Sequence, residues 1–163
     1  MNKIILASGI MSLVGFGFMS QDKIEDCLPE YVEKAQIIIQ EQELSNTKLV
    51  EALIQVESSG KENCVGDKHL IVPSIGVLQI RPIMVREVNR ILKRLGDNKR
   101  YTNKDRYSRV KSIEMFNVWK DFHHKDHSDE VISRCWNGGP KGYKRKKTLH
   151  YWDKVQKALK KIA

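Results

Sequence analysis

The chain has few of the residues that cross-link or interrupt a fold: its 163 residues include three cysteines, four prolines and ten glycines. No two cysteines have the CxxC spacing, so the sequence offers no zinc site. No internal repeat or low-complexity tract divides it. The segment of about 140 residues after position 20 therefore has the length of one domain with a single hydrophobic core.

Three cysteines are too few for a disulfide framework, but one pair could form a disulfide in an oxidising compartment and leave one thiol over. They are Cys27, Cys64 and Cys135. Cys135 lies in an apolar helical stretch and is interpreted as a small core residue. This favours the pair Cys27 and Cys64 without fixing it.

Long apolar runs are absent except at the start, where residues 4–19 follow Lys3 without a charge. The run is slightly long for a secretory signal and slightly short for a membrane span, which takes ~20 residues. We predict that residues 1–20 are a signal peptide or an N-terminal membrane anchor. The protein is then exported to the periplasm or cell envelope, and it touches a membrane only through this segment if it is not cleaved.

Acidic residues are outnumbered, with 20 Asp and Glu against 29 Lys and Arg and a formal net charge of +9. A basic surface favours polyanionic partners. Wall polymers with free carboxylates and nucleic acids both qualify, and charge alone does not choose between them.

What the sequence does contain is a clear amphipathic helix over residues 45–60. Ser45 or Asn46 can cap its start, and Gly60 suits its end. Apolar residues recur at i, i+3, i+4 and i+7 on one face: Leu49, Ala52, Leu53 and Val56. Glu57 comes four residues after Leu53, so a carboxylate falls on the same face.

Glu57 has two interpretations. It can lie at the edge of the stripe and reach water or pair with a basic side chain. Alternatively it is partly desolvated, which disfavours its charged form, raises its pKa and leaves it able to donate a proton near neutral pH.

Four short motifs accompany this helix in a fixed order. They are Glu57-Ser58-Ser59-Gly60, Gly76-Val77-Leu78-Gln79-Ile80, Cys135-Trp136-Asn137-Gly138-Gly139-Pro140, and Tyr151 in front of a basic amphipathic helix. In this order and spacing the chain resembles the soluble lytic transglycosylase family over residues 45–162. The resemblance implies a lysozyme-like fold related to goose-type lysozyme, within a catalytic domain of residues 21–163.

The resemblance also implies a site. Glu57 would be the catalytic residue, and the substrate-binding residues would be Ser58, Gln79, Trp136, Asn137 and Tyr151. The family usually has Ala-Tyr-Asn-Ala-Gly at the third motif, so Trp136 replaces a tyrosine and Asn137 is retained.

The chemistry that the resemblance implies needs one acid. Ordinary glycosidases place two carboxylates across the scissile bond, whereas no second motif carboxylate accompanies Glu57. A lytic transglycosylase cleaves the bond between N-acetylmuramic acid and N-acetylglucosamine without water, with one residue as general acid and then base, and leaves a 1,6-anhydro sugar. We therefore expect no metal and no cofactor, peptidoglycan glycan strands and an envelope-spanning machine as partners, and no nucleic acid.

Two alternatives stay open. Asp67 could position a water molecule in a goose-type-like muramidase, or it could be a turn residue in Gly66-Asp67-Lys68. From a different class, the chain could be a basic module, catalytically weak, that binds the wall or nucleic acid.

The remaining pattern predicts a mainly α, lysozyme-like α+β fold. Helices are expected over residues 28–42, 82–95, 128–137 and 148–162, with one more that is capped by Ser108 and ends at a histidine tract. Between residues 60 and 82 the helical period stops, and short β-capable runs at 70–72 and 77–80 predict a small β-like lobe. The histidine tract, His123, His124 and His127, lies at a charged helix end and is not interpreted as a zinc site.

Overall fold

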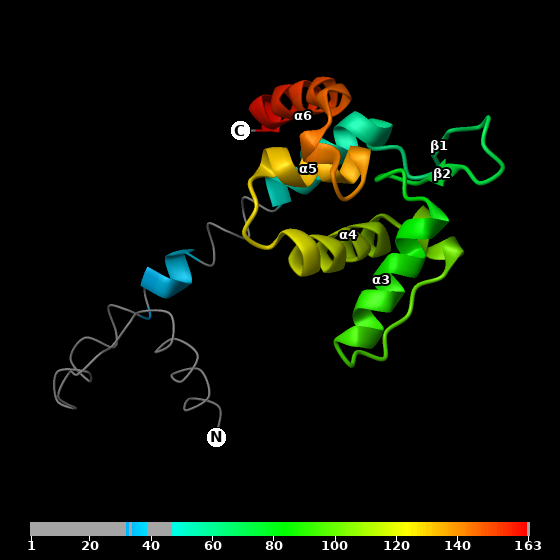
Figure 1. Cartoon of the computed structure of the whole chain (residues 1–163), viewed down its shortest axis with the longest axis horizontal. Helices are drawn as coiled ribbons and strands as arrows, with labels where there is room; N and C mark the ends of the chain where they lie inside the picture. The colour runs from blue at the N-terminus through cyan, green and yellow to red at the C-terminus, as the bar shows by residue number, and fades with distance from the viewer. Residues whose placement is uncertain (1–31, 33, 39–46, 163) are drawn as a thin grey trace. The chain divides into compact units, whose positions relative to one another are not determined.

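A computed structural model of the chain describes residues 32, 34–38 and 47–162 (Figure 1). Residues 48–163 form one compact unit, and the fold below is that of this unit. The predicted signal or anchor at 1–20 and the predicted disulfide partner Cys27 lie outside the described residues. Of the helix predicted at 28–42, residues 32 and 34–38 are described, and they are helical.

The unit is mainly helical with one two-stranded antiparallel sheet, which confirms the predicted fold class. A helix at residues 47–58 comes first. The other elements are β1 (Val65–Gly66), β2 (Ser74–Ile75), α3 (Pro82–Arg94), the 3-10 helix η1 (Asn103–Tyr107), α4 (Arg109–His124), α5 (Asp129–Gly138), the 3-10 helices η2 (Gly142–Lys144) and η3 (Lys146–Thr148), and α6 (Leu149–Ile162). Within the described part of the chain, no helix is long and apolar enough to cross a membrane.

The 47–58 helix supplies much of the core. Leu49, Ala52 and Leu53 are almost fully buried, as their spacing predicts. Val50 and Ile54 are also buried, so the apolar face is wider than one stripe. In the rest of the unit α3 packs against α4, and α5 packs against α4, α6 and η2 (Figure 1).

The predicted helix starts at Ser108 and Ser128 are confirmed. Each serine Oγ accepts a hydrogen bond from the backbone N–H three residues on, at the first turns of α4 and α5. Asp129 and Glu130 follow in the first turn of α5, where negative charge complements the helix dipole.

The β-like lobe differs from its prediction in register. The strands lie at 65–66 and 74–75 instead of 70–72 and 77–80. Gly76 has φ +82° and Gln79 has φ +48°, so the chain reverses between them. The backbone N–H of Ile75 then donates to the carbonyl oxygen of Ile80 at 3.1 Å, and that of Ile80 donates back at 2.9 Å. Residues 76–79 are therefore a tight turn, which apolar alternation alone does not reveal.

Arg106 fastens this turn to the rest of the unit. Its side chain is buried, and its guanidinium donates to the carbonyl oxygens of Pro73 at 3.2 Å and Ile80 at 3.1 Å. Its own carbonyl oxygen lies against Gly76, where a Cβ would approach to 1.9 Å. The segment 97–107 thus ends in η1 and holds the turn in place.

Gly76→Ala tests this packing. We expect the free energy of unfolding to fall by about 2–4 kcal/mol, because the new methyl group meets a backbone oxygen and the positive φ disfavours alanine. Gly96→Ala is the matched control, since Gly96 also has a positive φ but nothing lies within 4 Å of its Cβ position; it should cost only about 1 kcal/mol. Equal losses in urea denaturation would contradict the tight contact.

Candidate functional site

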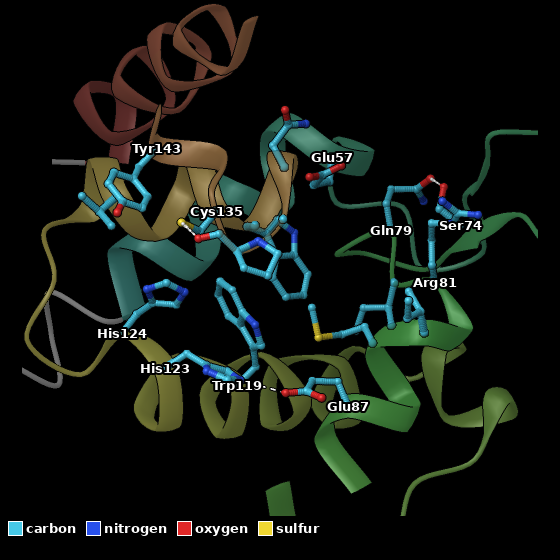
Figure 2. A pocket seen from close by; sticks show the side chains of 18 of the residues that line it. Glu57, Ser74, Gln79, Arg81, Glu87, Trp119, His123, His124, Cys135 and Tyr143 are labelled. Atoms are coloured by element: carbon cyan, nitrogen blue, oxygen red, sulfur yellow. Dashed lines mark hydrogen bonds and ion pairs between the residues drawn. The ribbon is translucent and has the colours of Figure 1, made fainter. Parts of the chain in front are cut away.

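An open cleft of about 960 Å³ lies between the end of the 47–58 helix, the sheet and α3 on one side and α4, α5 and η2 on the other (Figure 2). In Figure 2, Gln79 and Ser74 lie on the opposite side of the cleft from His124 and Tyr143. Its lining mixes aromatic, apolar and ionisable side chains. They include Glu57, Asp67, Gln79, Ile83, Met84, Glu87, Trp119, His123, His124, His127, Trp136, Asn137 and Tyr143.

Glu57 lies at the edge of this cleft, in the last turn of its helix. The hydroxyl of Tyr151 donates a hydrogen bond of 2.7 Å to Glu57 Oε1. Burial of the carboxyl raises the pKa of Glu57 from 4.5 to about 7 against the opposing effects of the Tyr151 hydrogen bond and the charge of Lys154, while the charge of Asp67 raises it further. Of the two interpretations of Glu57, the geometry favours the desolvated acid.

The hydrogen bond also fixes which oxygen can act in the cleft. Burial, followed by the charge of Glu57, raises the pKa of Tyr151, so its hydroxyl stays protonated and remains a donor. Oε1 of Glu57 accepts from it. In the neutral acid, the proton on Oε2 is then free to be donated to a bound molecule.

Three of the predicted substrate-binding residues have their polar groups occupied within the protein. The hydroxyl of Tyr151 is engaged by Glu57, and Tyr151 is not among the residues that line the cleft. Ser58 is buried, and its hydroxyl lies 3.2 Å from the carbonyl oxygen of Ile54 and 2.9 Å from that of Val77. It fastens the helix to the turn and does not line the cleft.

Gln79 lines the cleft, but its amide is also engaged. Nε2 donates to the carbonyl oxygens of Cys64 at 3.2 Å and Gly76 at 2.8 Å, and Oε1 accepts from the Ser74 hydroxyl at 2.9 Å. A Cβ on Gly66 would come within 2.1 Å of Oε1, so glycine is needed there. Gln79 therefore holds the cleft wall together.

The geometry of Asp67 has features of both interpretations given to it. It is exposed, lines the cleft and has φ +47°, a turn conformation that aspartate tolerates. Its charge reaches the carboxyl of Glu57, as the pKa of that group shows.

Trp136 and Asn137, predicted to bind substrate, both line the cleft, and Trp136 belongs to an aromatic cluster. Its ring centroid lies 5.1 Å from that of Phe116 and 5.2 Å from that of Trp119 in edge-on arrangements. Trp119 is buried and also lines the cleft. Cys135 is buried as predicted, and it and Cys64 are free thiols.

Tyr143 was not among the predicted site residues. It stands in η2, exposed at the cleft, within a run of basic residues that reads as a solvated loop. A lone aromatic residue in that run is the only sequence signal that could have indicated it.

The histidine tract also lines the cleft, which the sequence did not indicate. His123 Nε2 lies 2.8 Å from Glu87 Oε1. Glu87 also pairs with Arg90, and the hydrogen bond from Arg90, followed by that from His123, lowers the pKa of Glu87 to about 2. Among the described residues no group of three His, Cys, Asp or Glu side chains could hold a metal ion.

Comparison with known proteins finds similarity in structure only. No protein-family model and no curated protein matches the chain. A chain in the crystal structure of Aeromonas hydrophila PliI in complex with Meretrix lusoria lysozyme matches with a TM-score of 0.56 and 19% identity, over 68% of this chain and 87% of that chain. A chain in the structure of inhibitor-bound lysozyme from Meretrix lusoria matches with a TM-score of 0.55 and 19% identity, over the same shares of 68% and 87%.

The fold is therefore one found in complexes of a lysozyme with its inhibitor, which is a lysozyme-related structural context. The predicted peptidoglycan lytic transglycosylase is contradicted by this comparison, because neither matched structure is named as a member of that family. The same comparison contradicts the predicted lyase and glycosidase classes. The roles of Glu57 as acid and then base belong to that reaction and are withdrawn with it.

The physical reason for this error lies in what the motifs specify. The serine of the first motif and the glutamine of the second use their polar groups to fasten the helix end and the turn. The motifs thus encode the geometry of a cleft wall, and a shared wall does not imply a shared reaction.

The raised pKa of Glu57 predicts how stability depends on pH. The folded state holds the Glu57 proton more tightly than the unfolded state, so wild type loses stability relative to Glu57→Gln as pH rises from 4.5 through about 7. We expect the free energy of unfolding of Glu57→Gln, relative to that of wild type, to be about 3 kcal/mol higher at pH 8 than at pH 4. Urea denaturation of both proteins from pH 4 to 8 measures it, and a constant difference across that range would show that Glu57 is an ordinary exposed carboxylate.

Proposed function

We propose that this chain is an exported protein of the cell envelope that binds an amino-sugar glycan strand of peptidoglycan in its cleft. The observation that carries the proposal is Glu57, an acid whose pKa of about 7 leaves it still partly protonated near pH 7, at the edge of a cleft lined by aromatic rings. A neutral acid can donate a hydrogen bond to a glycan oxygen without placing an unpaired charge in the site.

The aromatic lining supports a sugar ligand. Trp119, Trp136 and Tyr143 offer ring faces or edges on one side of the cleft, and Ile83 and Met84 offer apolar surface on the other. Sugar rings have apolar faces and polar edges, so they fit a groove that combines aromatic contact with a few hydrogen-bonding groups. The basic surface adds attraction for the carboxylates of the wall, and export rests on the apolar run at residues 4–19.

Tyr143→Ala tests the aromatic wall. We expect the Kd for the neutral tetrasaccharide chitotetraose to rise about tenfold, because an exposed ring that would be covered by the sugar is removed. Binding can be followed by tryptophan fluorescence, since two of the three tryptophans line the cleft.

Tyr107→Ala is the control, because Tyr107 is equally an exposed tyrosine but does not line the cleft. It should leave the Kd unchanged. Absence of any fluorescence change and of any binding to chitotetraose or to purified wall sacculi by the wild type would overturn the proposed function.

A second candidate is the binding of a wall-processing protein at the same cleft. The loop between β1 and β2 exposes Ile71 completely and Val72 in part, and both ends of this loop line the cleft. Exposed apolar side chains beside a groove are typical of protein interfaces. The two matched structures, in which a lysozyme is bound to an inhibitor, favour such a partner.

Ile71→Asp separates the two candidates. If a protein docks on this loop, the wild type should form a complex with Meretrix lusoria lysozyme in size-exclusion chromatography and reduce its activity, and the variant should bind at least tenfold more weakly because a charge enters an apolar contact. Chitotetraose binding should be equal in both proteins. No complex at micromolar concentrations would remove this candidate.

A further inference from the structure

Most of the positive charge of the chain lies in one short segment at its C-terminal end. Residues 141–161, which contain η2, η3 and most of α6, hold nine of the 29 Lys and Arg residues and one of the 20 Asp and Glu residues. They therefore carry +8 of the formal net charge of +9. All nine basic side chains are exposed, and we call them the C-terminal basic patch: Lys141, Lys144, Arg145, Lys146, Lys147, Lys154, Lys157, Lys160 and Lys161.

The spacing of the lysines in α6 gives this helix a basic face. Lys154, Lys157 and Lys161 follow His150 at i+4, i+7 and i+11, so the four side chains share one face (Figure 1). Tyr151 and Val155 lie on another face of α6 and are buried. None of the nine basic residues lines the cleft, so the patch is a surface separate from it.

The charges of the patch are not neutralised within the protein. Elsewhere in the unit cations pair with carboxylates, as in Arg90–Glu87, Lys99–Glu114, Arg109–Glu51, Lys111–Asp105 and Arg134–Glu130. Within residues 47–162 none of the nine basic side chains forms an ion pair, and neither does Asp153, the acid of the segment. Like charges three or four residues apart on a helix repel one another, and a bound polyanion would remove this repulsion.

The composition of the patch indicates what kind of polyanion fits. Eight of the nine residues are lysines, whose ammonium is a point charge and lacks the planar fork with which arginine binds individual phosphates. Leu149 is 44% exposed at the start of α6, between Lys147 and His150. Lysines on an outer helix face with an exposed apolar side chain beside them are typical of a helix that lies on a membrane surface.

A single-stranded nucleic acid fits this surface less well. Such strands are held by rings on which successive bases stack. Tyr143, the exposed tyrosine of the segment, lines the cleft, and its ring already lies 5.5 Å from the Lys144 ammonium. The basic face of α6 itself offers lysines and His150.

We propose that the C-terminal basic patch is a docking surface for a bilayer of anionic phospholipids, with the basic face of α6 toward the headgroup phosphates. A lysine close to such a surface contributes about fivefold in affinity, and salt screens the attraction. The patch is separate from the cleft, so this inference does not rest on glycan binding.

Vesicle titrations with the full chain at pH 7 test the patch. One variant replaces three patch lysines with glutamine, namely Lys147, Lys157 and Lys161. Lys154 is kept, because its charge reaches Glu57. The control variant loses the same charge from three other exposed lysines that form no ion pair within residues 47–162, namely Lys93, Lys104 and Lys125.

The measured quantity is a ratio of two partition coefficients. One is for vesicles of phosphatidylcholine with about one quarter phosphatidylglycerol, and the other is for phosphatidylcholine alone. Any contribution of the apolar run at residues 4–19 is common to the three proteins and to both lipids, so it cancels in the ratio.

We expect wild type to favour the anionic vesicles by about a hundredfold or more, and the patch variant to keep less than about tenfold of this preference. The control variant should stay within about threefold of wild type, because its lysines lie outside the patch. In about 1 M NaCl, where the screening length is ~3 Å, the preference of wild type should disappear.

Three results would overturn the proposal. They are a wild type without preference for anionic vesicles, equal losses in the patch and control variants, and tighter binding of oligothymidylate than of anionic vesicles at equal phosphate concentration. The last result would assign the patch to a soluble phosphodiester strand. Thermal unfolding shows that each variant is folded. Chitotetraose binding should be equal in all three proteins, and its absence from wild type would overturn the proposed function alone.

Discussion

The structure depends on one constraint, that a carboxyl group is buried at the end of the helix that forms much of the core. Burial of Glu57 costs free energy whenever the group is ionised, and the Tyr151 hydrogen bond offsets only part of it. The pKa of the group is therefore raised to about 7, so it stays largely protonated at pH values below that. The cleft therefore contains a hydrogen-bond donor at a pH where an exposed glutamate would be an anion.

The surrounding residues keep this arrangement rigid. The Ser58 hydroxyl joins the helix to the turn at Val77, the Gln79 amide closes that turn, and Arg106 ties the turn to η1. Tyr151 reaches Glu57 from α6, which lies 94 residues away in the sequence. Each of these groups has its polar atoms engaged inside the protein. The groups that remain for a bound molecule include Glu57, Asn137, His124 and the aromatic rings.

The fold was largely predictable because it rests on local patterns. The spacing of Leu49, Ala52 and Leu53, and the caps at Ser108 and Ser128, gave helices where the structure has them. The turn at 76–79 was missed because it depends on positive φ angles and on contact with Arg106, which lies far along the chain. Glu57, Trp136 and Asn137, which the resemblance made site residues, line the cleft. Tyr143 and His124 also line it but were not indicated by the sequence, since only tertiary packing brings η2 and the end of α4 to it. The lytic transglycosylase reaction was wrongly inferred because the motifs specify the geometry of one side of the cleft and not the chemistry that takes place in it.

The most direct test of this account is a titration of the Glu57 carboxyl by carbon-13 NMR, with Glu57→Gln to identify its signal. The account predicts a midpoint near pH 7, about two and a half pH units above that of an ordinary glutamate. A midpoint near 4.5 would show a solvated carboxylate and would contradict the neutral donor on which the proposed binding site depends.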